Sequence, residues 1–247
     1  MSTQKDFHLC KGPIRREQVQ NMSLSQKLAV LNNIYRCYDE FTKTLKIACQ
    51  KYCAMCCTPN VTMTTLEGYL IVDFLISKGR QDLFERIQKA MAGGRFKPRT
   101  TTNRLAVLCA KGDEPPHETR YDEGKRCPLL TEDLCPIYPV RPFGCRCFIS
   151  EKDCNPTGYA NIDPFIITVN TIYLQVLEHI DAAGFSGNFA DVMQWMAKKE
   201  NRERYKSNAL KQRYADFVSN RPIEVLMVPP EHRNKIKPII NTLFKIS

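Results

Sequence analysis

The chain has 247 residues, enough for one large or two modest domains with a real hydrophobic core. Hydrophobic residues make up 43% and charged residues 25%, which is typical of a globular protein and excludes a disordered one. The formal net charge is +10. A chain of this length can form a stable core without using its twelve cysteines as disulfides.

Helices are expected in the first part of the chain. Ser23 has capping-box spacing to Gln26, and apolar residues then recur at helical intervals, so a helix is expected to end close to Cys49. Thr64 and Glu67 indicate a second helix start. A third helix is expected over residues 80–92, ending at two consecutive glycines.

The middle of the chain does not have a helical pattern. Residues 95–126 are polar and contain two adjacent prolines, so they are predicted to form a long irregular connection. Prolines also interrupt the cysteine-rich block 127–156, which is therefore expected to be loop rather than regular helix. A loop of this length in a globular domain indicates a functional segment, or one held by something other than packing.

The last part of the chain is again helical in pattern. Asp163 and Pro164 predict the start of an amphipathic helix that ends near Gly184. Shorter helices are expected over 188–217, a short strand at 223–228 and a final helix at 230–245. The sequence thus predicts a mostly α fold with little β structure. We expect a single domain over residues 1–247, with a metal-binding core at 46–156 and a helical part at 160–247.

The location of the protein bears on the state of its thiols. Residues 1–13 are polar and lack the layout of a signal peptide, and the apolar run 69–76 is far shorter than the roughly 20 residues that span a bilayer. We therefore expect a cytoplasmic protein that does not contact a membrane, where thiols stay reduced. Cysteines in that compartment favour metal ligation over disulfides.

Nine of the cysteines form two groups. The first is Cys49-x3-Cys53-x2-Cys56-Cys57, and the second is Cys127-x7-Cys135-x9-Cys145-x-Cys147-x6-Cys154. Closely spaced cysteines in loops let thiolates converge on one ion, at about 2.3 Å for zinc. Side chains of adjacent residues diverge, so Cys56 and Cys57 favour two sites, or one site and a thiol with another role.

With these motifs the chain resembles the YkgJ-type cysteine-cluster family, whose members are described as zinc- or iron-chelating or as containing iron–sulfur clusters. The resemblance lies in the CxxxCxxCC segment, in MTTLE (63–67), and in CPLLTEDLCPIYPVRPFGCRCF (127–148) with a final cysteine at 154. Cys147 is an addition to the pattern, and Met55 replaces the usual glycine. The resemblance implies eight metal ligands: Cys49, Cys53, Cys56, Cys57, Cys127, Cys135, Cys145 and Cys154.

The metal itself stays open between an iron–sulfur cluster and zinc, because four-thiolate sites suit both. Cys127 and Cys135 each precede a proline, as in ferredoxins, which favours an iron–sulfur cluster, of the 4Fe-4S type. We expect a metal-binding protein with a role in electron transfer, metal handling or structure. The alternatives are an iron–sulfur enzyme with an open iron, since Cys49, Cys53 and Cys56 also match the spacing of radical-SAM enzymes, or a zinc-stapled interaction module.

Two arginines near the cysteines are expected to support metal binding. Arg141 and Arg146 flank Cys145, and we expect them to donate hydrogen bonds to sulfur and to offset thiolate charge. Cys37 is expected to be plain core, and ligation by Cys147 is left open. A redox or acidic protein partner fits the basic surface, whereas the basic run 198–214 is interpreted as a solvated helix face rather than as a nucleic-acid site.

Overall fold

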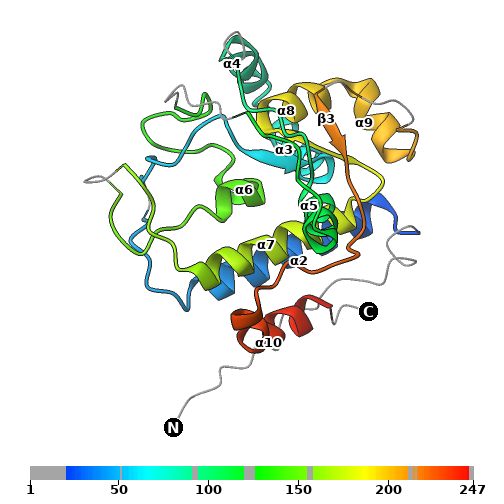
Figure 1. Cartoon of the computed structure of the whole chain (residues 1–247). Coiled ribbons are helices and arrows are strands. Elements are labelled where there is room, and N and C mark those ends of the chain that lie inside the picture. Colours follow the sequence, from blue (N-terminus) through cyan, green and yellow to red (C-terminus); the bar gives the residue numbers. More distant parts are fainter. Residues whose placement is uncertain are drawn as a thin grey trace.

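The computed structural model describes residues 21–50, 52–90, 94–119, 126–154, 158–210, 214 and 216–244. Over these residues the fold is mostly helical, as expected, and includes one small sheet (Figure 1). The helices are α2 (Leu24–Thr42), α3 (Thr65–Ser77), α4 (Asp82–Ala90), α5 (Thr102–Lys111), α6 (Phe143–Arg146), α7 (Pro164–Ile180), α8 (Phe189–Ala197), α9 (Lys199–Lys206) and α10 (Arg233–Phe244). Two short 3-10 helices are η1 (Tyr138–Val140) and η2 (Pro230–His232), and the strands are β1 (Thr62–Thr64), β2 (Phe185–Asn188) and β3 (Phe217–Ser219).

Helices α2 and α7 pack side by side along the lower part of the molecule in Figure 1. Ser23 begins α2 through the predicted capping box with Gln26, and Asp163 caps α7 one residue before Pro164. Between the two helices, the Tyr38 hydroxyl donates a hydrogen bond to Asn170 Oδ1 (2.7 Å). Both helices contact the cysteine-rich block, because Phe143 packs against Tyr38 of α2 and Tyr173 of α7.

Helix α3 is apolar on nearly all sides and is buried, as expected for a helix without a polar face. It packs against both α2 and α8. The capping box of Thr64 and Glu67, predicted from the sequence, is present at its start, directly after β1. Neither α3 nor any other helix of the described residues is long and apolar enough to cross a bilayer.

The sheet joins segments that are far apart in the sequence. Its strand order is β1-β2-β3 and both pairings are antiparallel, with Thr64 opposite Ser186 and Ser186 opposite Val218. Strand β1 lies directly after the first cysteine segment, and β2 follows α7. The sheet therefore fixes the end of the first cysteine segment to the helical core.

The expected irregular connection over residues 95–126 contains helix α5, so that prediction was wrong for part of the segment. Thr101 caps α5 by accepting the Arg104 N–H, and Gly112 ends it in the left-handed conformation. The stop signal is a glycine at the usual position after a helix. The helix packs on α7 through its few buried residues, including Ala106.

The strand predicted at residues 223–228 is absent from the structure, which has irregular backbone there. Side chains of α7 form the hydrogen bonds with this backbone that a neighbouring strand would otherwise form. Gln175 accepts the Met227 N–H (2.9 Å) and donates to the Val225 carbonyl (2.7 Å), and His179 accepts the Ile223 N–H (3.1 Å). The prediction of a strand was therefore wrong, although Ile223, Leu226 and Val228 are partly buried and pack against the core.

Some helix ends also differ from those predicted. Helix α2 ends at Thr42 rather than near Cys49, and α7 ends at Ile180, before Gly184. Within the cysteine-rich block, the expected loop contains the short helix α6, whose N-cap is Pro142. A proline is tolerated before the first turn of a helix, because the N–H it lacks would be unpaired there.

Candidate metal centre

The two cysteine segments lie side by side in space, on the same side of the molecule in Figure 1. Three hydrogen bonds join them directly. The Cys127 N–H donates to the Cys57 carbonyl (2.8 Å), the Ala48 N–H donates to the Ser150 carbonyl (2.8 Å), and the Ser150 N–H donates to Cys49 Sγ (3.3 Å). Residues seventy or more positions apart in sequence are thus brought together by backbone N–H groups.

Helix α6 carries Cys145 and is anchored to three other helices. The Phe143 ring is fully buried, stacks on Tyr173 of α7 at 5.4 Å between ring centroids, and meets Tyr38 of α2 edge-on at 4.7 Å. The Phe143 N–H donates to Glu67 Oε1 of α3 (2.7 Å). Because the same Glu67 oxygen also accepts the Tyr35 hydroxyl (2.8 Å), one buried carboxylate links α2, α3 and α6.

Arg146 holds the loop before α6 rather than a sulfur atom. Its side chain is 4% exposed, and it donates to the carbonyls of Pro139 (2.6 Å) and Arg141 (3.0 Å). It also pairs with Asp39 at 3.1 Å and lies over the Tyr35 ring at 4.1 Å. These contacts are all with oxygen atoms or with a ring. They include no sulfur atom, in contrast to the expected donation from Arg146 to sulfur.

Arg141 lies close enough to several of the thiols for its charge to act on them. Its guanidinium stacks over Tyr138 at 3.7 Å and donates to the Tyr138 carbonyl (2.9 Å). Burial raises the pKa of Cys135 and of Cys145, and the positive charge of Arg141 opposes both shifts. Arg141 is therefore placed to offset the charge of thiolates at these positions.

Backbone N–H groups point at several of the sulfur atoms. Burial raises the pKa of Cys127 to about 11, and hydrogen bonds from the N–H groups of Leu129 and Leu130 oppose that shift. The N–H of Ile137 acts on Cys135 in the same way. Hydrogen bonds of this kind stabilise a thiolate, the form of cysteine that ligates metals.

We group the eight predicted ligands by the charges that act on Cys49, Cys57 and Cys145, and call the two groups the inner set and the outer set. The inner set is Cys57, Cys127, Cys135 and Cys145. The outer set is Cys49, Cys53, Cys56 and Cys154. Burial is the main cause that raises the pKa of Cys145, followed by the nearby Cys127 and Cys135. For Cys49, burial also raises the pKa, and Cys53, Cys56 and Cys154 add to the rise.

Cys56 and Cys57 join the two sets through a mutual hydrogen bond. This bond lowers the pKa of Cys57 and raises that of Cys56. Burial and the charges of Cys127, Cys145 and Cys135 raise the pKa of Cys57 and so oppose the effect of the hydrogen bond. Each of the two neighbouring thiols therefore has the other as its leading electrostatic partner, and the expected divergence of the two side chains is not seen.

The remaining cysteines and histidines are placed as follows. Cys147 is half-buried, donates to the Gly144 carbonyl of its own helix at 3.5 Å, and has its pKa raised to about 12 by burial. Cys37 is buried as expected but is disulfide-bonded rather than a plain core thiol. Cys109 and His117 are exposed, and Cys10 lies outside the described residues.

The fit of this donor set to a metal can be judged from its chemistry. In the part of the chain that the structure describes, no three histidine, cysteine, aspartate or glutamate side chains are already arranged to hold an ion. Several of the thiols nevertheless lie close enough for their charges to interact. Sulfur ligands in groups of four suit zinc and iron–sulfur clusters alike. The residues therefore fit either group once their thiols converge.

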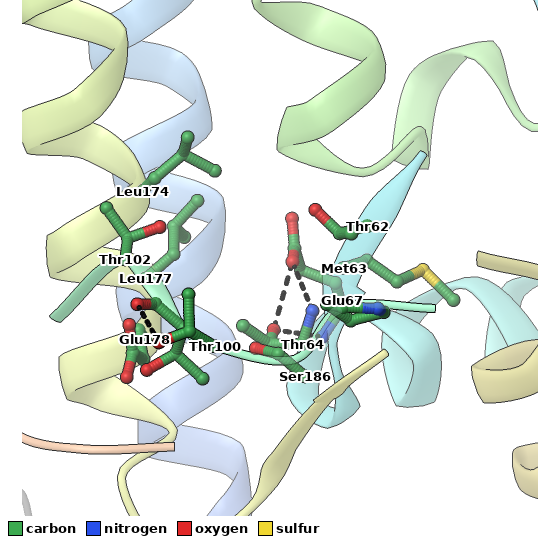
Figure 2. Close-up of a pocket in the computed structure, with 12 residues that line it drawn as sticks. Thr62, Met63, Thr64, Glu67, Thr100, Thr102, Leu174, Leu177, Glu178 and Ser186 are labelled. Carbon is green, nitrogen blue, oxygen red and sulfur yellow. Dashed lines mark hydrogen bonds between the residues drawn. The ribbon is translucent and has the colours of Figure 1, made fainter. Parts of the chain in front are cut away.

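A small cavity of about 60 Å³ lies beside this region, between β1, the start of α3 and α7. Figure 2 shows Glu67 and Glu178 on opposite sides of it. Neither carboxylate is unpartnered. Glu67 accepts the Thr64 N–H (2.8 Å), and Glu178 accepts the N–H groups of Asn103 (2.7 Å) and Arg221 (2.8 Å). The cavity has room for a few water molecules and offers no unoccupied acid or base.

These features define a class of protein, in which a helical scaffold gathers cysteines from two loop segments into one region. Residues 48–163 match the model of the CxxCxxCC family, described as a "putative zinc- or iron-chelating domain". The match covers a little less than half of the chain and confirms the resemblance seen in the cysteine spacing. No curated protein and no solved structure matches the chain.

Sequence reasoning did not find Glu67, Tyr35 and Asp39 as parts of this site. Glu67 was identified only as a helix-capping residue, yet it also accepts the N–H at the start of α6. Its two oxygens serve separate tasks, because Oε2 completes the capping box while Oε1 faces Tyr35 and Phe143. A carboxylate is a common capping residue, so the sequence carries no signal for its second role.

Proposed function

We propose that this protein binds a metal through its eight cysteine thiolates. The form that we favour is an iron–sulfur cluster, and zinc is the alternative. The observation that carries the proposal is the pairing of the two cysteine segments by three backbone-mediated hydrogen bonds. A chain that only needed to bury apolar surface would not place eight thiols in one neighbourhood. The match of residues 48–163 to a zinc- or iron-chelating family supports the same chemistry.

The surroundings of the thiols support a thiolate site. Backbone N–H groups donate to Cys49, Cys127 and Cys135, and the Arg141 guanidinium faces the same region. Hydrogen bonds to sulfur and a nearby positive charge both favour thiolate over thiol. Such groups also tune bound metals in known thiolate sites.

The choice of an iron–sulfur cluster over zinc rests on the Cys-Pro steps at Cys127 and Cys135. The role that fits an iron–sulfur centre beside exposed aromatic and basic groups is electron transfer with an acidic protein partner. Tyr138, which is 59% exposed, and Arg141 are the groups that such a partner would meet first. Zinc in the same thiols would instead serve metal handling or structure.

The test is purification without oxygen, followed by metal and sulfide analysis and an absorption spectrum. Broad absorbance near about 400 nm with iron and acid-labile sulfide is the expected result. A colourless protein with stoichiometric zinc would keep the metal-binding proposal and replace the cluster by zinc. A protein that carries neither metal, and takes up neither when reduced and loaded with it, would refute the proposed function.

A further inference from the structure

Helix α6 carries the predicted ligand Cys145 but is too short to hold its own shape. It has four residues, Phe143–Arg146. An isolated helix needs about 12–15 residues to be even marginally stable in water. The geometry of α6 is therefore set by contacts with the rest of the fold, and the same contacts set the position of the Cys145 thiol.

Two polar contacts fix this helix on either side of Cys145. Before the cysteine, the Phe143 N–H donates a hydrogen bond to Glu67 Oε1 of α3 (2.7 Å). After it, the Arg146 guanidinium pairs with Asp39 Oδ1 of α2 (3.1 Å). The thiol is thus held from both ends of a single helical turn, by two different helices of the core.

Tyr35 of α2 connects the two contacts to each other. Its hydroxyl donates to the same Glu67 Oε1 (2.8 Å), and the Arg146 guanidinium lies over its ring at 4.1 Å. All three residues are more than nine-tenths buried, with exposed fractions of 4% for Tyr35, 2% for Glu67 and 5% for Arg146. They form one buried network around α6, which we call the α6 network.

The charges in the α6 network are not explained by stability alone. Burying a carboxylate and a guanidinium costs solvation energy, and apolar residues of similar volume are often at least as stabilising. A fully satisfied network of buried hydrogen bonds, in contrast, defines one geometry. Such a network is typical of the groups that surround a metal ligand and hold it in place before the metal binds.

We propose that Glu67, Tyr35 and Arg146 are positioning residues, which hold Cys145 where a bound metal requires its thiolate. None of the three contacts the metal in this role, and each acts through α6. A ligand that is already in place binds more tightly, because less of the loop remains to be ordered on binding. This inference rests on the proposed function and adds to it three residues that the cysteine spacing does not reveal.

Two tyrosines of the chain form a matched pair for the test. Tyr35→Phe keeps the ring and removes one hydrogen bond to Glu67. Tyr205→Phe removes the same kind of bond, because the buried Tyr205 hydroxyl donates to a buried carboxylate, Asp181 Oδ1 (2.7 Å). Asp181 in turn accepts the Leu66 N–H of α3 (3.0 Å) and is not bonded to α6. Only the first substitution therefore alters the α6 network.

The measurement separates zinc affinity from stability. The affinity of the reduced, metal-free protein for Zn²⁺ is measured by competition with a chromogenic chelator, and its stability by thermal unfolding without metal. We expect the two variants to lower the unfolding midpoint by similar amounts, since each loses one buried hydrogen bond. Tyr35→Phe should bind zinc about tenfold more weakly than the wild type, whereas Tyr205→Phe should keep the wild-type affinity.

A second substitution keeps the test decisive if Tyr35→Phe does not fold. Arg146→Lys retains the charge but loses the planar group that donates to the Pro139 carbonyl and to Asp39 together, so the same tenfold loss is expected. Wild-type zinc affinity in the variant tested, or an equal loss in Tyr205→Phe, would overturn the positioning role while leaving metal binding intact. A wild-type protein that takes up neither zinc nor iron would instead refute the proposed function itself.

Discussion

Gly144 lies where α6 comes closest to β1. A Cβ added there would lie 2.8 Å from the Thr62 carbonyl oxygen and 2.5 Å from Val61 Cγ1. Such a contact with backbone cannot be relieved by a side-chain rotation, so α6 would have to move. The glycine directly before Cys145 is therefore needed to position the inner thiol.

We predict that Gly144→Ala lowers the free energy of unfolding by about 1–3 kcal/mol and also weakens metal binding. Thermal unfolding and metal content measure the two effects. Gly79→Ala is the matched control, because Gly79 has φ +65° but no atom within 4 Å of an added Cβ. The control should lose about 1–2 kcal/mol and keep its metal. Equal metal content in both variants would contradict the role given to Gly144.

The protonation of the thiols predicts a pH dependence of metal binding. Burial raises the pKa of Cys127 to about 11 and also raises that of Cys135 and Cys145, so these thiols carry protons at neutral pH in the metal-free protein. Each must lose its proton to become a ligand. Metal affinity should therefore rise with pH, and metal binding should release protons.

We expect zinc binding to release roughly three or four protons per ion, with affinity that increases between about pH 6 and pH 8. Calorimetry in buffers of different ionisation enthalpy measures both quantities. If the affinity did not change over that range and no protons were released, thiols would not be the ligands.

At the scale of elements, one ring makes the buried aromatic contact between α6 and the helical core. Phe143 packs between Tyr38 of α2 and Tyr173 of α7, and it is fully buried. Phe148, just after the same helix, is 46% exposed and makes no comparable contribution to the core. The two phenylalanines therefore form a matched pair for a test.

Phe143→Ala should destabilise the protein by about 3–5 kcal/mol, because it removes a buried aromatic side chain and leaves a cavity. Phe148→Ala should change stability by no more than about 0.5 kcal/mol. Urea unfolding with and without saturating metal measures both changes. A Phe148 effect as large as that of Phe143 would show that α6 is attached elsewhere.

Element starts could be predicted from the sequence wherever a local hydrogen bond decides them. Ser23 with Gln26, Thr64 with Glu67, and Asp163 with Pro164 begin their helices as predicted, because each cap involves residues within a few positions. The segment 223–228 could not be predicted in this way. Its backbone partners are side chains of Gln175 and His179, about fifty residues away.

The same distinction applies to the candidate site. The resemblance to the cysteine-cluster family identified the eight candidate ligands, since its motifs are local in each segment. The pairing of the two cysteine segments, and the link from Glu67 to α6, depend on contacts across the fold. Such contacts leave no periodic signal in one sequence, so the structure was needed for them.

At the scale of the whole molecule, a bound metal would join the two cysteine segments, which lie at the periphery of the apolar core. Helices α2, α3 and α7 contribute most of the core, whereas the cysteine segments add only a few buried side chains, such as Leu129, Ile137 and Phe143, and are otherwise joined by hydrogen bonds. Metal binding to the native state alone stabilises it, by about 4 kcal/mol when the free metal is a thousand times its dissociation constant. Removing the metal should therefore loosen the loops before the helices.

We predict that chelation increases deuterium exchange in residues 46–60 and 126–154 and leaves α3 and α7 protected. Mass spectrometry of exchanged peptides, compared between loaded and chelated protein, makes the measurement. Increased exchange spread evenly over the chain would mean that metal supports the entire fold. Unchanged exchange in the two segments would contradict a metal between them.

X-ray absorption at the metal edge of the purified, loaded protein tests the central claim most directly. The account predicts a first coordination shell of sulfur alone, at about 2.3 Å for zinc or for iron in a cluster. A first shell that contains mainly oxygen or nitrogen would contradict it, whatever the metal content of the protein.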